Sequence, residues 1–230
     1  MSFAVWRENG MPEEPSWQIN PNEDIFDQMR KRPDKSRVNL FLILVNIAVF
    51  VYAEATGNTN DVEHMLKLGA SYAPYVHSGE YYRLFTSMFL HFGFPHLANN
   101  MILLLFIGDY VERYVGKVIY LILYLGSGFF AGWFSYRYDL MTGTASVSAG
   151  ASGAIFGVIG CLFILVLIHR GHLENLTLVR VLLMAVFSLI VGFQTAGVNG
   201  YAHLGGFIGG SVLAAVLWPL SKDHRKSGRV

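Results

Sequence analysis

Residues 146–160 read SVSAGASGAIFGVIG, a serine-rich start followed by an apolar run with glycine at every third or fourth position. This spacing is typical of a membrane helix whose backbone closely approaches a neighbouring helix. Ser152 stands at the start of the run, between Ala151 and Gly153. Its small side chain either lets two helices touch or supplies a nucleophile.

The composition of the whole chain is that of a membrane protein. Of its 230 residues, 53% are hydrophobic and 14% are charged, whereas soluble domains carry about 25% charged residues. The apolar residues form six blocks that are long enough to span or nearly span a bilayer. The blocks are residues 38–53, 95–111, 118–134, 150–168, 176–193 and 200–220.

The polar residues gather at the two ends of the chain. We expect a short polar cytoplasmic segment over residues 1–37, one membrane domain over residues 38–220 and a basic cytoplasmic tail over residues 221–230. The first twenty residues lack a signal-peptide pattern, so the first apolar block is expected to insert as the first span. The single cysteine, Cys161, excludes an intrachain disulfide and a Cys-based metal site. The net charge of +1 argues against a nucleic-acid partner.

The distribution of lysine and arginine predicts the orientation. With six spans and the N-terminus in the cytoplasm, only Lys67, Arg83 and Arg137 of the 17 basic residues fall outside. This bias supports a six-span domain with both termini in the cytoplasm. The longest outer loop, residues 54–94, ends in YYRLFTSMFLHFGF, which is aromatic and apolar but too interrupted for a span. Residues 81–94 either lie in the membrane or its interface, or form an ordinary extracellular loop.

Polar residues inside membrane spans are costly and often functional. The rise per residue of an α-helix gives the distance along its axis to the first cytoplasmic basic residue after each block. This distance is about 27 Å from Ser152 and about 28 Å from His203. The corresponding values for His96 and Asn100 are about 25 and 20 Å. Four polar residues from three helices therefore reach a similar level, toward the outer side.

The same residues also fall on faces that can pack together. The shared faces are Ser152, Gly153, Phe156 and Gly157 on the fourth block, and His203, Gly206 and Gly210 on the sixth. Glycines four residues apart let two backbones approach. A serine hydroxyl next to an imidazole is the minimal activated nucleophile. His96 and Asn100 share a face of the second helix, and both are donors suited to a developing oxyanion.

Each feature alone has an ordinary explanation. A serine in a glycine-rich span is usually a packing residue, and a membrane histidine usually serves structure or a proton path. His96 and Asn100 could form a polar clasp between helices. The convergence of all four at one depth favours an active site.

Four motifs together give the chain a family resemblance. They are GASGAIFG at residues 150–157, AHLGGFIGG at residues 202–210, HFGFPHLANN at residues 91–100 and GDYVERYVG at residues 108–116. Over residues 38–220 the chain resembles the rhomboid family of intramembrane serine proteases. The resemblance implies an all-α membrane protein, a six-transmembrane-helix bundle with a membrane-embedded first outer loop.

The resemblance also implies roles for individual residues. Ser152 would be the nucleophile and His203 the general base, without a carboxylate. His96, Asn100 and the Ser152 N–H would donate to the oxyanion. Structural residues near the site would be Arg83, Glu112, Gly150, Gly153, Phe156, Gly157, Gly206 and Gly210. The fifth helix and the loop over the site would gate lateral substrate entry.

Three positions depart from the family pattern: Tyr82, Ser87 and Phe156 stand where tryptophan, histidine and tyrosine are frequent. None of these changes removes the dyad. We therefore predict a serine endopeptidase that cleaves transmembrane segments of other membrane proteins near their outer ends, through an acyl-enzyme. The alternatives are a non-catalytic relative that binds membrane segments and a small transporter. No metal or other cofactor is expected; the expected location is the plasma membrane.

Overall fold

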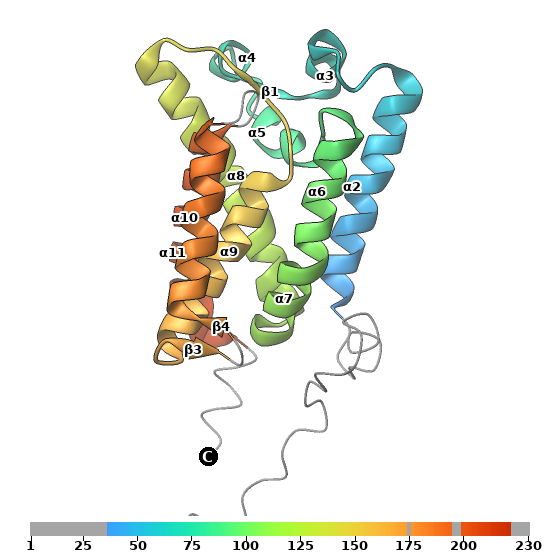
Figure 1. The fold of residues 1–230 in the computed structure, drawn as a ribbon. Helices are drawn as coiled ribbons and strands as arrows, with labels where there is room; N and C mark the ends of the chain where they lie inside the picture. Colours follow the sequence, from blue (N-terminus) through green and yellow to red (C-terminus); the bar gives the residue numbers. More distant parts are fainter. Residues whose placement is uncertain (1–35, 174–175, 195–198, 222–230) are drawn as a thin grey trace, which may run out of the picture. The chain divides into compact units, whose positions relative to one another are not determined.

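The computed structural model describes residues 36–173, 176–194 and 199–221. The predicted segment 1–37 and tail 221–230 therefore lie almost wholly outside the described residues. Each of the six predicted apolar blocks contains a helix (Figure 1). The elements of these blocks are α2 (Arg37–Thr56), α6 (Gly93–Leu103), the π-helical η2 (Leu104–Gly108), α7 (Asp109–Val115), α8 (Lys117–Thr142), α9 (Ser152–Ile168), α10 (Leu178–Gln194), α11 (Gly200–Leu217) and η3 (Trp218–Leu220).

The helices support an all-α membrane protein. Among the described residues, three helices are long and apolar enough to cross a bilayer: 37–56, 117–142 and 200–220. A fourth candidate is the bent pair Arg83–Phe89 and Gly93–Val115, which turns by 89°. The helices Ser152–Ile168 and Leu178–Ile190 are apolar but shorter. A short span requires the bilayer to thin locally or the protein to surround the helix.

The segment between α2 and α6 gathers at one end of the bundle (Figure 1). Its elements are α3 (Val62–Leu68), β1 (Ser71–Tyr72), α4 (Ala73–His77), α5 (Arg83–Thr86) and the 3-10 turn η1 (Ser87–Phe89). Strand β1 pairs antiparallel with β2 (Val147–Ser148), which lies just before α9. A second short pair, β3 (His172–Leu173) with β4 (Leu176–Thr177), connects α9 to α10.

The buried Arg83 side chain organises this segment, residues 57–92. Its guanidinium donates to the carbonyls of Leu66 at 2.7 Å and Ala70 at 2.9 Å, and pairs with Glu80 at 2.8 Å. The hydroxyl of Tyr82 and the Arg83 guanidinium hold the pKa of the Glu80 carboxyl below its usual value. Arg83 therefore joins α3, the turn before β1 and the start of α5 through one side chain.

Helix α9 lies at the centre of the bundle, packed against α8, α10 and α11. Where it contacts α11, the two helix backbones pack directly against each other at glycines. A Cβ on Gly206 would meet the Gly153 carbonyl oxygen at 2.0 Å, and a Cβ on Gly210 would meet the Gly157 oxygen at 2.1 Å. Since real Cβ atoms do not approach so closely, only glycine permits this helix separation.

At the opposite end of the bundle, α7 binds the start of α2. The Glu112 carboxylate accepts from the backbone N–H of Val38 at 3.2 Å and Asn39 at 2.6 Å. An anion at a helix N-terminus stabilises it by satisfying free N–H groups. The Asn39 side chain donates to the Leu104 carbonyl in the π-helical turn at 2.8 Å and accepts from Tyr120 at 2.6 Å. The buried backbone of that turn is thus hydrogen-bonded from α2.

We predict that Gly206→Ala destabilises the protein, because the new methyl overlaps the Gly153 carbonyl. Overpacking of this kind costs about 1–3 kcal/mol, measurable as a lower unfolding midpoint in detergent. Gly126→Ala is the matched control, since its Cβ would meet only the flexible Leu213 side chain. Equal midpoints for the two variants would contradict the glycine contact.

We predict that Arg83→Ala loosens the 57–92 segment. It removes the partner of two backbone carbonyls, and hydrogen bonds to a charged group each contribute about 1.5–3 kcal/mol. Proteolysis of residues 57–92 should accelerate and the unfolding midpoint should fall. Arg137→Ala, at an exposed position of α8, should change neither quantity.

Candidate functional site

Ser152 is the first residue of α9, and the chain leading to it is hydrogen-bonded to the 57–92 segment. Strand β2 is paired with β1. The N–H of Gly150 donates to the Ser87 carbonyl at 2.9 Å, and the N–H of Ala151 donates to Nε2 of His91 at 3.3 Å. Because the first N–H groups of a helix have no partner within it, the start of α9 presents free donors around the Ser152 hydroxyl.

His203 lies in the first turn of α11 and is 6% exposed. Its ring stacks on Phe156 of α9, with centroids 4.3 Å apart and an interplanar angle of 13°. Nδ1 of His203 has no hydrogen-bond partner among the described residues. Residues next to the predicted dyad lie close together, since a Cβ added to Gly153 would lie 3.7 Å from the Ala202 carbonyl oxygen. Within the described ranges, no hydrogen bond joins Ser152 to His203.

His96 faces Ser152 across Gly150. A Cβ on Gly150 would lie 2.9 Å from His96 Nε2 and 3.6 Å from Ser152 Oγ. Gly150 also has a φ of +147°, a region that residues with a side chain rarely adopt. The ring nitrogen and the hydroxyl therefore flank a small space that glycine keeps open. Asn100, one turn beyond His96 on α6, is 4% exposed, and its Nδ2 has no partner in the described part of the chain.

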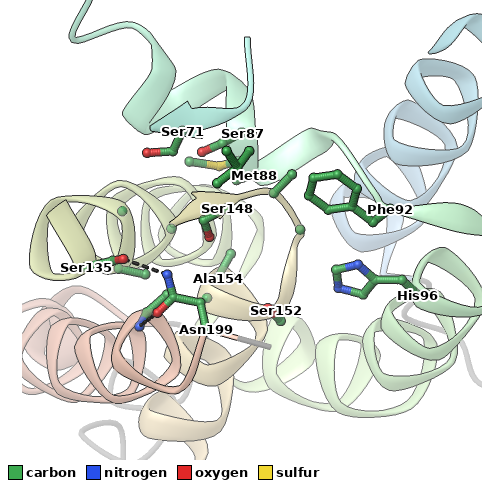
Figure 2. A pocket seen from close by; sticks show the side chains of 18 of the residues that line it. Ser71, Ser87, Met88, Phe92, His96, Ser135, Ser148, Ser152, Ala154 and Asn199 are labelled. Atoms are coloured by element: carbon green, nitrogen blue, oxygen red, sulfur yellow. Dashed lines mark hydrogen bonds between the residues drawn. The ribbon is translucent and has the colours of Figure 1, made fainter. Parts of the chain in front are cut away.

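A cavity of about 560 Å³ opens beside Ser152. Of the predicted site residues, Ser152, His96, Gly150 and Gly153 line it. His203 and Asn100 lie outside its lining, buried in the adjoining helices. Figure 2 shows His96 and Asn199 on opposite sides of the cavity, with Ser152 between them. The wall is rich in hydroxyl and amide groups, from Ser71, Ser87, Ser135, Ser148 and Asn199.

The remaining predicted residues lie outside the cavity lining. Phe156 packs on His203, and Gly157, Gly206 and Gly210 form the contact between α9 and α11. Arg83 binds the Ala70 carbonyl beside Ser71 of the cavity wall, and Glu112 binds the start of α2. Within the described ranges, no three His, Cys, Asp or Glu side chains gather to form a metal site.

Two residues at the site had no role in the sequence analysis. His91, which binds the peptide before Ser152, stacks edge-on against His96 with centroids 5.2 Å apart. Only its place in the HFGFPHLANN motif hinted at it. Asn199 caps α11, and the hint was an asparagine directly before an apolar block, a typical helix start.

Comparisons with known proteins agree with these motifs. A family model described as the Rhomboid domain matches residues 78–220. The chain is 32% identical to "Rhomboid protease GluP" of Bacillus subtilis (strain 168) over 183 residues, which are 80% of this chain and 35% of that protein. It is 30% identical to "Rhomboid protease AarA" of Providencia stuartii over 200 residues, 77% of this chain and 71% of that protein.

A third relative is "Putative rhomboid protease YdcA" of Bacillus subtilis (strain 168), 32% identical over 139 residues, 60% of this chain and 68% of that protein. The chain thus spans about a third of GluP and about two thirds of the other two. The family match covers more than half of the chain and includes α6, α9 and α11, which carry the candidate site. The chain belongs to the rhomboid family.

Proposed function

We propose that the protein is an intramembrane serine endopeptidase with Ser152 as nucleophile and His203 as general base. The observation that carries this proposal is the position of Ser152, in the first turn of a buried helix and at the edge of a cavity whose wall carries several serine hydroxyls. The glycine contact brings the helix of His203 against the same turn of α9.

In the proposed mechanism, His203 takes the proton of the Ser152 hydroxyl as Oγ attacks the peptide carbonyl. His203 then gives this proton to the leaving amine, and water hydrolyses the acyl-enzyme. Stacking on Phe156 restricts the imidazole plane. The hydrogen bond between serine and histidine would form when substrate fills the cavity, because catalytic hydrogen bonds are often long without substrate.

His96, Asn100 and the N–H of Ser152 are the proposed oxyanion donors. His96 Nε2 already faces the space above Gly150. The Asn100 amide is buried without a partner in the described chain, and a buried donor of this kind costs free energy unless a ligand uses it. Three converging donors suit a tetrahedral intermediate.

We further propose six spans with both termini in the cytoplasm of a plasma-membrane protein, and the cavity toward the outer side. The proposed substrate is a transmembrane segment cut near its outer end, with a small residue before the cut and a locally unwound helix. The embedded outer segment, residues 57–92, would shield the cavity from lipid. No cofactor takes part in this scheme.

We predict that Ser152→Ala abolishes labelling by a fluorophosphonate probe and lowers cleavage of a model transmembrane substrate by at least about 10³-fold, as expected for a lost nucleophile. Ser146→Ala, in the loop before β2, should label normally. Undiminished cleavage by Ser152→Ala would refute the protease. An unreactive wild-type protein that still binds transmembrane segments, or moves solute across liposomes, would favour the alternatives.

We predict that Asn100→Ala lowers kcat by about 10²-fold with little change in KM, because removal of one oxyanion donor acts mainly in the transition state. The matched control is Asn99→Ala, since Asn99 is the exposed neighbour. Steady-state cleavage in liposomes measures both constants. If the two variants had the same kcat, Asn100 would have no part in catalysis.

A further inference from the structure

Asn199 binds the first turn of α11 at two points. It occupies the N-cap position, and its side-chain oxygen accepts from the N–H of Ala202 at 2.9 Å. Its backbone carbonyl accepts from the N–H of His203 at 3.2 Å. Any movement of Asn199 is therefore passed directly to the peptide that carries His203.

The same side chain also reaches a different helix. Its Nδ2 donates to Oγ of Ser135 on α8 at 2.6 Å, and Ser135 is 6% exposed. Both residues line the cavity beside Ser152, and Figure 2 shows this bond at the cavity wall. Two residues later, Tyr201 stacks on Tyr138 of α8. The first turn of α11 is thus joined to α8 by a directional hydrogen bond and a ring contact.

Because α11 contacts its neighbours through glycine, it needs a directional bond such as that from Asn199 to Ser135 to fix its position. On one side, Gly206 and Gly210 lie against backbone carbonyls of α9; on the other, Gly205 and Gly209 lie against Phe134 and Phe130 of α8. Glycine faces allow close approach. Because they present no side chain to interlock, they limit rotation and sliding of α11 only weakly. A hydrogen bond of defined length limits both.

We propose that Asn199 is a positioning residue for the His203 imidazole. By capping α11 and binding Ser135, it holds the first turn of α11 at the height and rotation at which the imidazole meets the Ser152 hydroxyl. This inference rests on the proposed function, in which His203 activates Ser152.

The test compares Asn199→Ala, Asn199→Asp and Ser135→Ala with the wild-type protein in liposomes. Asn199→Ala removes the cap and the bond to α8. Ser135→Ala removes only the bond to α8. Asn199→Asp keeps both, since aspartate is an equally good N-cap and its carboxylate accepts from the Ser135 hydroxyl. Asp61→Ala is the matched control, because Asp61 caps α3 in the same way.

The readouts are the rate of fluorophosphonate labelling of Ser152, kcat and KM for a model transmembrane substrate, and the unfolding midpoint. We expect labelling and kcat to fall by about tenfold in Ser135→Ala, the factor that corresponds to one lost hydrogen bond. They should fall further in Asn199→Ala, which also loses the cap. KM should stay within about twofold, because substrate binding is not altered. Asn199→Asp should keep labelling within about threefold of wild type, because both bonds persist. Asp61→Ala should label at the wild-type rate.

Ser135→Ala keeps the test decisive if Asn199→Ala does not fold. Wild-type labelling rates in both Asn199→Ala and Ser135→Ala would overturn the inference while leaving the proposed function intact. Loss of labelling in Asn199→Asp equal to that in Asn199→Ala would also overturn it, since the bonds would then not be the cause. A wild-type protein that never labels at Ser152 would overturn the proposed function first, and this inference with it.

Discussion

The backbone contact between α9 and α11 is the constraint on which the rest of the structure depends. The carbonyl oxygens of Gly153 and Gly157 occupy the positions that side chains on Gly206 and Gly210 would need. Between apolar helices in a membrane, such packing replaces the hydrophobic driving force available in water. Ser152 is the neighbour of Gly153 in the chain, and His203 lies about one turn before Gly206. This contact therefore also determines how far apart the two candidate catalytic groups lie.

Two groups of polar interactions lie at opposite ends of the bundle. At one end, the 57–92 segment is joined to the chain before Ser152 through β1 and β2, the Ser87 carbonyl and His91. At the other end, Glu112 and Asn39 satisfy a helix N-terminus and a π-helical turn. Unsatisfied backbone groups are costly in an apolar environment. At these two places, side chains satisfy backbone groups that the helices leave without a partner.

The residues around the cavity are held in place by different kinds of contact. Ser152 and Gly150 belong to a chain that is bound at several points, and His96 stands on α6 beside it. Helix α11 contacts α8 and α9 through glycine faces. At its first turn, Asn199 donates a directional hydrogen bond to Ser135 of α8. The relation between Ser152 and His203 therefore depends on helix packing more than on a direct bond between them, which is consistent with the absence of that bond within the described residues.

The sequence by itself determined the membrane class and the apolar blocks in which the helices lie, because hydropathy and helical periodicity are local properties. Even there, the ends differ: α8 extends to Thr142, beyond the block predicted to end at residue 134, and the second block contains a π-helical turn that follows no local signal. Only the tertiary structure decided that Ser148 pairs with Ser71, that His91 binds the peptide before Ser152, and that Asn199 reaches Ser135. These contacts join residues 60 to 77 positions apart, and a hydrogen bond over that separation leaves no periodic trace in either segment.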